Sequence, residues 1–343
     1  MENSNQAYQK SGVNVQAGDD LVNWLEKSAV TSDLVVQGIG GFASLTRIPS
    51  SLYKNPLLVS CADGVGTKAL LAAQTRKVRG LGQDLVAMNV NDLICTGGDP
   101  YYFLDYWASG KLDLELLKDF LEGVKEACKQ SECLLIGGET AEMPGLYQKS
   151  EFDCAGFSTG FVSEDAIWGA HNVKVGTEIW ALPSSGFHSN GYSLLRQIFS
   201  KDLDKWMDQL LIPTALYVKF IKSLKKQKLK IQAAAHITGS GFQNISRVLP
   251  EFTKAEIKPF AFPELFCEVQ NRTQMSDLEM LNTLNCGVGF VVFISPSESQ
   301  NFQSMALSEK QKTWKLGEVI SSEVKEPDFI VLPGEFNLHK SLK

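Results

Sequence analysis

The chain has 343 residues, of which 44% are hydrophobic and 21% charged, values typical of a packed globular protein rather than a disordered one. This length exceeds what one hydrophobic core usually supports, so two domains are expected, with one large domain as the alternative. With 33 Lys and Arg against 39 Asp and Glu, the formal net charge of -6 argues against general electrostatic binding of nucleic acid. An anionic ligand therefore needs a local site.

The seven cysteines are scattered without a CxxC pair, so we expect reduced thiols. Cys128 and Cys133 lie close in sequence, but none of the four histidines is spaced with them as a zinc site requires. The first twenty residues are polar and lack the pattern of a signal peptide, and no apolar run approaches the ~18 residues of a membrane span. A cytoplasmic protein without membrane contact is the expectation.

Short apolar runs and helical patterns alternate along the chain. Residues 57–60 lead into 63–68, which predicts a strand, a glycine turn and the start of a helix. Apolar residues recur at helical spacing over 113–130, which predicts an amphipathic helix. Residues 133–136 predict a short buried strand that ends in a glycine-rich, acidic loop at 137–145.

A polar segment at 163–176 marks the expected domain boundary, and we predict domains of 1–168 and 169–343. Beyond it, residues 178–182 predict a strand and 192–199 a helix. Strands and helices thus alternate in both halves, which indicates an α/β protein with mixed sheets of the α+β type.

Five glycine-rich segments also carry an acid, an amide, a hydroxyl or a cation. Phosphate chemistry uses this combination, because it needs bare backbone N–H groups, a cation or metal ligand, and little side-chain bulk. The segments lie at residues 38–43, 63–68, 82–92, 137–145 and 184–193. Taken alone, the first fits a phosphate-wrapping loop or simply a mobile loop.

The second segment places Asp63 at a strand end and Lys68 at a helix start, which suits metal, phosphate and nucleotide. It also matches GxGxxA from Gly64 to Ala69, so a dinucleotide-binding dehydrogenase is an alternative. Against that alternative, the Asp63 carboxylate would repel a pyrophosphate unless a divalent cation lay between them. Dinucleotide folds use no such metal.

The third and fourth segments combine glycine with carboxylates. Residues 82–92 are apolar enough for a buried strand or helix yet include Asp92, and a buried carboxylate needs a partner. A capping or hydrogen-bonding network is one explanation. We favour magnesium held by Asp92 with Asp63 or Glu139, because such oxygen ligands suit a cation that carries nucleotide phosphates.

The fifth segment predicts a loop that leads to a helix N-terminus, where N–H groups face a phosphate. Two further glycine turns, 236–242 and 285–289, are either ligand loops or ordinary turns. His236 is in the same way either a ligand contact or a core histidine. Cys286 is not expected to be a nucleophile, because no adjacent His activates it.

Five motifs of this chain resemble the aminoimidazole ribonucleotide synthetase family in their order and spacing. They are DGVGTK at 63–68, DLVAM at 84–88, GGETAEMPG at 137–145, HSNGYSL at 188–194 and NCGVG at 285–289. The resemblance extends from about Tyr8 to Val331, and GGETAEMPG is its most specific part. It implies a two-domain α/β subunit that dimerises through its N-terminal sheet.

The resemblance also implies the reaction: ATP and Mg²⁺ convert formylglycinamidine ribonucleotide to aminoimidazole ribonucleotide, ADP and phosphate, in de novo purine biosynthesis. The formyl oxygen would attack the γ-phosphate to give an iminophosphate, and the amidine nitrogen would then displace phosphate and close the ring. Positioning and charge neutralisation would be the protein's task.

The family roles carry over to matching positions of this sequence. The residues implied to bind the nucleotide are Gly38, Gly40, Gly41, Phe42, Gly64, Gly66, Thr67 and Lys68. Those implied to hold magnesium are Asp63, Asp92 and Glu139, and those implied to bind the substrate are Glu139, Ser189, Gly191, Thr238 and Gly239. The implied catalytic residues are Asp63, Lys68, His188 and Asn190. His suits proton movement because its pKa lies near neutrality.

The chain departs from the family pattern at Ser240, where a glycine is usual, and a positive φ there would make serine costly. Lys27 lies near a nucleotide-proximal lysine of the family without clearly matching it. Within the superfamily, the competing functions are a thiamine-monophosphate kinase and a selenophosphate synthetase, although residues 38–43 lack the reactive cysteine of the latter. From a different class, a catalytically silent nucleotide-binding protein is a further alternative.

Overall fold

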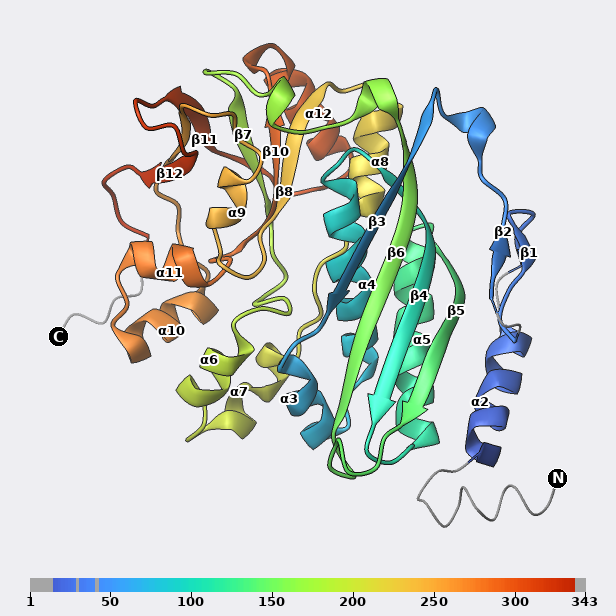
Figure 1. The fold of residues 1–343 in the computed structure, drawn as a ribbon. Helices are drawn as coiled ribbons and strands as arrows, with labels where there is room; N and C mark the ends of the chain where they lie inside the picture. Colours follow the sequence, from blue (N-terminus) through green and yellow to red (C-terminus); the bar gives the residue numbers. More distant parts are fainter. Residues whose placement is uncertain (1–14, 29–30, 41–42, 337–343) are drawn as a thin grey trace. The chain divides into compact units, whose positions relative to one another are not determined.

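The chain forms two compact units (Figure 1). The computed structural model describes residues 15–28, 31–40 and 43–336. The first unit runs to Leu93 and resumes over Pro100–Asp165, and the second comprises Ile94–Asp99 and the chain from Ala166 onward. The division after Asp165 falls inside the polar segment in which the boundary is expected, while the domain limits themselves stay a prediction.

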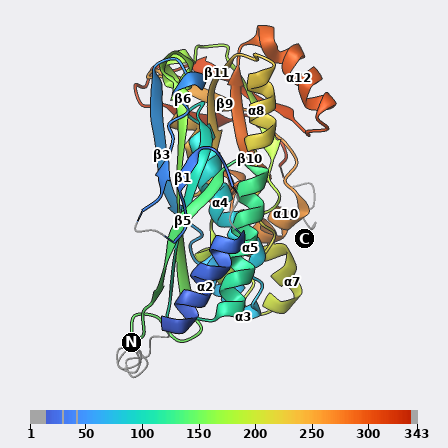
Figure 2. The same cartoon turned by 90° about the vertical axis from the view of Figure 1, so that its right-hand side faces the viewer.

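The first unit contains a four-stranded sheet in the order β3-β6-β4-β5. The four strands are β3 (Pro56–Gly64), β4 (Asp99–Ser109), β5 (Leu134–Glu142) and β6 (Phe152–Ser163). A separate two-stranded sheet consists of β1 (Val35–Gln37) and β2 (Leu45–Thr46). The helices of this unit are α2 (Val15–Ser28), α3 (Lys68–Thr75), α4 (Arg79–Ile94) and α5 (Leu114–Gln130). Figure 2 shows α2 in front of α5, and the two helices are in contact. The strand at 57–60 and the helices at 68 and 113–130 are confirmed.

Helix α5 shows why its sequence is helical and which face it buries. Asp113 caps its N-terminus by accepting a hydrogen bond from the backbone N–H of Leu116, at 3.1 Å. Its buried face includes Phe120, which packs on Trp107 of β4, and Trp107 in turn stacks on Phe152 of β6 with ring centroids 4.0 Å apart. This aromatic layer fixes α5 against the sheet.

Helices α4 and α5 approach each other closely at two glycines. A Cβ at Gly82 would lie 2.2 Å from the Phe120 carbonyl oxygen, and a Cβ at Gly123 would lie 1.9 Å from the Arg79 carbonyl oxygen. Only glycine permits this spacing. The third glycine-rich segment is therefore part of a buried helix, and Gly82 serves helix packing.

Strand β5 is longer than the sequence predicts. The predicted strand ends at 136, but β5 continues to Glu142 in parallel register with β4, where Asp105 lies opposite Gly138. The loop that contains Pro144 begins only afterwards. The prediction of a loop at 137–142 is wrong because the ladder hydrogen bonds of the neighbouring strand outweigh the low strand propensity of glycine.

The second unit contains a six-stranded sheet in the order β12-β9-β11-β7-β10-β8. Its strands are β7 (Glu178–Pro183), β8 (Ile231–His236), β9 (Thr253–Ile257), β10 (Val288–Ile294), β11 (Trp314–Ser321) and β12 (Asp328–Val331). Its helices are α6 (Tyr192–Ile198), α7 (Leu203–Leu210), α8 (Val218–Lys226), α9 (Gln243–Ser246), α10 (Glu264–Thr273), α11 (Asp277–Thr283) and α12 (Ser299–Ser308). Short 3-10 helices also occur in the chain, at Ser50–Leu52, Glu164–Ala166, Ala170–Asn172 and Pro296–Glu298.

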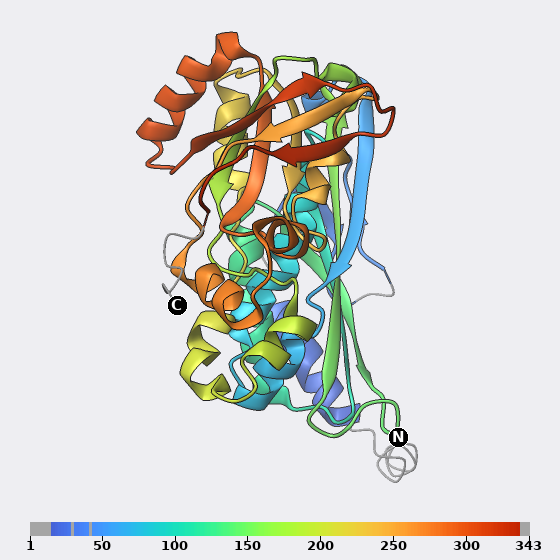
Figure 3. The same cartoon turned by 90° about the vertical axis from the view of Figure 1, so that its left-hand side faces the viewer.

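Strand β10 is buried along its whole length between β7 and β8, and it pairs with both in antiparallel register. Figure 3 shows the strands of this sheet, coloured from yellow-green to red, in the upper part of the view. Among the described strands of this sheet, β12 and β9 pair in parallel, and the other neighbouring strands pair in antiparallel register. The mixed sheets with packed helices confirm the α/β fold class. In the part of the chain that the structure covers, no helix combines the length and apolar character needed to cross a membrane.

Candidate active site

The first unit contains a cavity of about 800 Å³ beside the edge strand β5. Its walls come from α2, the loop between β1 and β2, strands β4 and β5, and α5. The apolar part of the lining includes Leu21, Leu25, Leu121 and Leu135. The rest of the lining consists of glycine backbone and a few polar side chains. This composition is typical of a small-molecule site.

Three residues predicted from the sequence line this cavity. Gly38 and Gly40 come from the first glycine-rich segment, and Glu139 comes from GGETAEMPG. The two segments are joined where the Ser44 hydroxyl donates to the Ile136 carbonyl oxygen, at 2.5 Å. Gly41 and Phe42 lie outside the described residues. The cavity therefore unites two motifs that are about a hundred residues apart.

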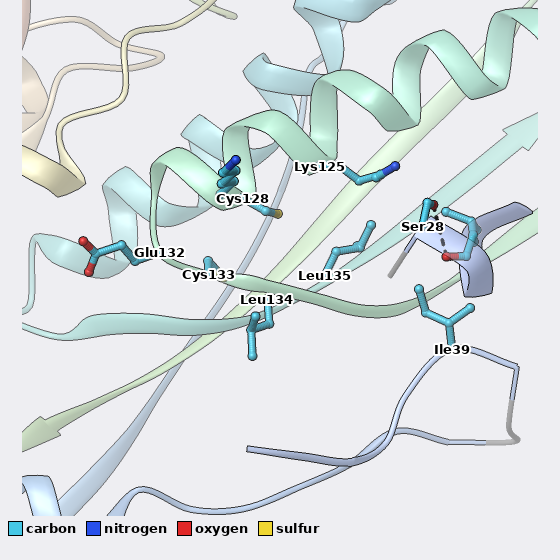
Figure 4. Close-up of a pocket in the computed structure, with 10 residues that line it drawn as sticks. Ser28, Ile39, Lys125, Cys128, Glu132, Cys133, Leu134 and Leu135 are labelled. Carbon is cyan, nitrogen blue, oxygen red and sulfur yellow. Dashed lines mark hydrogen bonds between the residues drawn. The ribbon is translucent and has the colours of Figure 1, made fainter. Parts of the chain in front are cut away.

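A smaller cavity of about 250 Å³ shares Leu25, Ile39 and Leu135 with the larger one. Figure 4 shows Cys128 and Lys125 on α5, above Leu134 and Leu135 of β5. Ser28 of α2 lies to the right of Lys125 in this view. The ammonium group of Lys125 lies 2.7 Å from Glu122 and 4.7 Å from the centroid of the Trp24 ring. The two cavities therefore adjoin each other near the edge strand β5.

Asp105 lines the large cavity and is absent from the residues predicted from the sequence. It lies on β4 and is 7% exposed. Burial raises the pKa of its carboxyl to about 7. An acid in the apolar run YYFLDYWAS was the available signal, because a strand rarely buries a carboxylate without a purpose.

The end of β3 and helix α4 bring Asp63 and Asp92 near one another, around Cys61. Burial, and then the negative charges of Asp92 and Asp63, raise the pKa of the Cys61 thiol to about 12. Asp63 is partly buried, and its Oδ1 accepts a hydrogen bond from the Gly64 N–H at 2.8 Å. The side chain of Asn89 on α4 donates to the Asp63 carbonyl oxygen at 3.3 Å, which holds the strand end against the helix.

These carboxylates fit a magnesium ion that keeps part of its water shell. Among the residues that the structure describes, no three His, Cys, Asp or Glu side chains gather as a closed metal cage would need. Magnesium bound with nucleotides takes only one or two protein carboxylates, and its other ligands are phosphate oxygens and waters. Asp63 and Asp92 match that donor set, whereas Glu139 lines the cavity at β5.

Lys68 begins α3, and Thr67 is its N-cap residue. The Lys68 ammonium nitrogen lies 2.7 Å from Oδ2 of Asp84 on α4, and both side chains are almost completely buried. Burial lowers the pKa of Lys68, although the Asp84 carboxylate opposes that shift. The lysine predicted to contact phosphates is thus held in a buried ion pair in this structure, while its predicted role stays a prediction.

In the second unit, two glycine-containing loops meet at His188. The Asn285 side chain donates to the Gly186 carbonyl oxygen and accepts from the Ser184 hydroxyl, at 2.9 and 3.0 Å. A Cβ at Gly289 would lie 2.6 Å from Cε1 of His188. The segments 184–193 and 285–289, which are separate in sequence, are therefore one structural unit.

His188 is fully buried and has a positive φ of 62°. Its Nε2 accepts a hydrogen bond from the Ser185 backbone N–H at 3.2 Å, and Ala215 N–H lies 3.5 Å away. A neutral ring that accepts at Nε2 carries its proton at Nδ1. Its ring centroid lies 6.1 Å from that of His236, which is also buried.

The remaining predicted substrate residues lie near the same loops. Gly191 is the N-cap residue of α6, as predicted for a loop that leads into a helix. Ser189 is buried, with its hydroxyl 3.4 Å from that of Thr214. A Cβ at Gly239 would lie 3.4 Å from Oδ1 of Asn190, so the loop of Thr238 and Gly239 adjoins the HSNG loop.

Ser240 adopts a positive φ of 68°. Serine is therefore expected to cost stability at this position, because an L-residue with a side chain is strained in the left-handed region. Ser240 is exposed, so its side chain gains no packing in return. Next to it, Gly241 also has a positive φ, of 53°.

Two family models match the chain, one in each unit. The AIR synthase related protein N-terminal domain matches residues 45–162, and the AIR synthase related protein C-terminal domain matches residues 174–328. Together the two matches cover most of the chain.

Two curated relatives carry the name phosphoribosylformylglycinamidine cyclo-ligase. The protein of Methylobacillus flagellatus is 40% identical over 345 residues, which cover 96% of this chain and 99% of the relative. The protein of Thermoanaerobacter pseudethanolicus is 42% identical over 333 residues, which cover 92% of this chain and 98% of the relative.

Solved structures with the same fold are much more distant in sequence. Thiamine-monophosphate kinase from Stenotrophomonas maltophilia has a TM-score of 0.66 at 16% identity, covering 90% of this chain and 95% of its own. The hydrogenase maturation protein HypE from E. coli has a TM-score of 0.67 at 16% identity, covering 92% and 95%. A HypE in complex with ATP has a TM-score of 0.61 at 13% identity, covering 85% of each chain.

Proposed function

This chain belongs to the phosphoribosylformylglycinamidine cyclo-ligase family, and we propose on that premise that it closes the imidazole ring of aminoimidazole ribonucleotide at the expense of ATP. The substrate is formylglycinamidine ribonucleotide, and the other products are ADP and phosphate. The observation that carries the proposal is the near full-length identity of 40–42% to two cyclo-ligases, joined to a cavity that unites the first glycine-rich segment with the family motif GGETAEMPG.

The reaction has two steps. The formyl oxygen attacks the γ-phosphorus of ATP, so an O–P bond forms while the bond to ADP breaks. The amidine nitrogen then attacks the activated formyl carbon, loses a proton, and expels phosphate as the ring closes. Activation is needed because an amide oxygen leaves poorly, whereas phosphate leaves well. The protein accelerates both steps by positioning the reactants and neutralising charge.

The cavity of the first unit is the proposed nucleotide site. Its volume of about 800 Å³ suits a nucleotide, and its glycine-rich wall at Gly38 and Gly40 lets backbone N–H groups approach phosphates. The ATP complex of HypE supports a nucleotide site on this fold. Gly64, Gly66, Thr67 and Lys68 are proposed to contact the phosphates from the turn between β3 and α3.

Magnesium is the proposed companion of ATP, with Asp63 and Asp92 as its protein ligands and Glu139 as a ligand or a substrate contact. When bound, the ion would neutralise the phosphate oxygens as charge develops on them. The hydrogen bond from the Gly64 N–H to Oδ1 of Asp63 orients this carboxylate group at the end of β3.

The second unit is proposed to bind the ribonucleotide through Ser189, Gly191, Thr238 and Gly239. His188 and Asn190 are proposed to assist the proton transfers. Because Nε2 of His188 faces backbone N–H groups, Nδ1 is the nitrogen at which this histidine would hold or move a proton.

A homodimer is proposed through the sheet of the first unit. Large apolar side chains are exposed on its strands: Leu57 and Leu58 of β3, Leu104 of β4 and Phe157 of β6. Leu58 is 65% exposed and Phe157 44%. Such an apolar surface favours burial against a second copy of the chain. The cytoplasm is the proposed location, as befits purine biosynthesis.

The test is to mix purified protein, ATP, Mg²⁺ and formylglycinamidine ribonucleotide, and to measure ADP and the aromatic amine product together. Equal amounts of both are expected. ADP without the ring product would favour a phosphotransferase, the activity named for the distant kinase neighbour. Asp63→Asn should abolish turnover while the protein stays folded; undiminished turnover would remove Asp63 from the site.

A further inference from the structure

We propose that Asp105 selects adenine in the nucleotide cavity, by pairing with the edge of the base that carries the exocyclic amino group. The inference rests on the proposed function only in taking the nucleotide of this cavity to be ATP. Asp105 is not among the residues that the motifs predict.

The position of Asp105 is set by its neighbour on the adjoining strand. Asp105 of β4 lies opposite Gly138 of β5, which is the edge strand of the sheet. A Cβ at Gly138 would lie 2.3 Å from Oδ1 of Asp105. The missing side chain therefore leaves the room into which the carboxyl group reaches, and both residues line the large cavity.

The carboxyl group is directed into this cavity without a side-chain partner among the described residues. Burial raises the pKa of this carboxyl group, and a hydrogen bond from its own backbone N–H opposes that shift. An isolated buried carboxyl group is costly to the fold. A polar ligand group that pairs with it would recover this cost when the cavity is filled.

The cavity walls favour a flat, apolar ligand beside the carboxyl group. Leu21 and Leu25 of α2 lie on one wall, and Leu121 of α5 and Leu135 of β5 add further apolar surface. No Lys or Arg is among the residues that line the large cavity within the described chain, so these walls suit an uncharged ring. A purine base satisfies both requirements.

The protonation state of the carboxyl group decides which purine fits. A protonated carboxyl group offers an O–H donor next to a C=O acceptor. Adenine presents an amino donor next to a ring-nitrogen acceptor, so the two edges match. Guanine presents two adjacent donors, N1–H and the N2 amino group, which match an ionised carboxylate instead. Because burial raises its pKa to about 7, Asp105 offers the protonated form on the acid side of neutrality.

The titratable groups near Asp105 come from α5, β4, β5 and β6. Cys128 of α5 and Cys154 of β6 interact with Asp105, and burial raises the pKa of both thiols well above the usual value. Tyr106 and Glu139 line the same cavity from β4 and β5, and the lining residues of α2 are apolar or glycine. Lys125 and Glu132 line the smaller cavity.

The test compares Asp105→Leu and Asp105→Asn with the unchanged protein. Affinities for non-hydrolysable analogues of ATP and GTP are measured between pH 6 and 8 by titration calorimetry. Asp105→Leu should weaken binding of the ATP analogue about tenfold or more, because one or two hydrogen bonds to the base are lost. Asp105→Asn should retain it, because an amide presents the same donor and acceptor pair at every pH.

The pH profile separates recognition from a merely structural role. In the unchanged protein, affinity for the ATP analogue should fall as pH rises through 7, since the acid form is the one that matches adenine, and the preference for ATP over GTP should shrink. Asp105→Asn should show neither change. Asp119→Asn, which alters an exposed carboxylate of α5, is the matched control and should behave like the unchanged protein.

Loss of fold is separable from loss of binding, because replacing a buried unpartnered carboxyl group with leucine should maintain or raise the melting temperature. An unchanged ratio of ATP to GTP affinity in Asp105→Leu would overturn the inference. So would a selective rise in KM for formylglycinamidine ribonucleotide, which would place the substrate here instead. If base selection follows Asp105 but no ring product forms, the proposed function fails while this inference stands.

Discussion

The buried ion pair of Lys68 and Asp84 gives the sharpest prediction about the first unit. The two charged atoms are 2.7 Å apart, with side chains 1% and 0% exposed. Removing one partner leaves a buried charge without its counter-charge, which costs about 3–5 kcal/mol. We therefore expect Lys68→Met or Asp84→Leu alone to lower the melting temperature by roughly 6–20 °C, at ~2–4 °C per kcal/mol.

The double variant Lys68→Met/Asp84→Leu should be more stable than the sum of the single changes predicts. It replaces both charges with apolar groups of similar volume, so at least ~2 kcal/mol of the summed loss should return. The assay is a double-mutant cycle by urea denaturation, followed at fixed pH by circular dichroism. Single-variant losses in the free energy of unfolding that add to within ~0.5 kcal/mol would refute the proposed coupling of the pair.

ATP turnover of the refolded double variant then shows whether Lys68 also contacts the phosphates. Turnover retained without a cation at position 68 would exclude that role.

Two further predictions concern Ser240 and the exposed sheet. Ser240→Gly should raise the free energy of unfolding by up to ~1 kcal/mol in a denaturant titration, because the positive φ of 68° is strained for serine, and a fall would show that the loop is not strained. Leu58→Arg should convert the proposed dimer to a monomer in sedimentation or light-scattering measurements, because a charge cannot be buried in an apolar contact without a partner. An unchanged dimer would place the interface elsewhere, and Leu307→Arg, on α12 of the second unit, is the matched control at a leucine that is 80% exposed.

Local pattern was enough to predict the elements that carry their own signals. The helix at 113–130 has apolar residues at helical spacing and a capping Asp113, and the strand and helix around the DGVGTK turn have clear boundaries. Features that depend on distant partners were not predictable in this way. The extension of β5 through Gly138 needs the ladder of β4, and a single sequence does not show which strands pair.

The same limit applies to the candidate site. The motifs led to Gly38, Gly40 and Glu139, which line one cavity, and to Asp63 and Asp92, which lie near Cys61. They also led to Lys68 as a phosphate contact, but they did not reveal its buried ion pair, because that pair depends on Asp84 of another helix. Asp105 was overlooked because its importance comes from the cavity and from the missing side chain at Gly138, neither of which a strand sequence displays.

The central claim is that ATP activates the formyl oxygen of the substrate before the ring closes. It is tested most directly with formylglycinamidine ribonucleotide labelled with oxygen-18 in the formyl group. The inorganic phosphate released is then examined by mass spectrometry. The account predicts that the label passes to phosphate, one atom for each ring closed. Unlabelled phosphate, with oxygen-18 found in water instead, would contradict it.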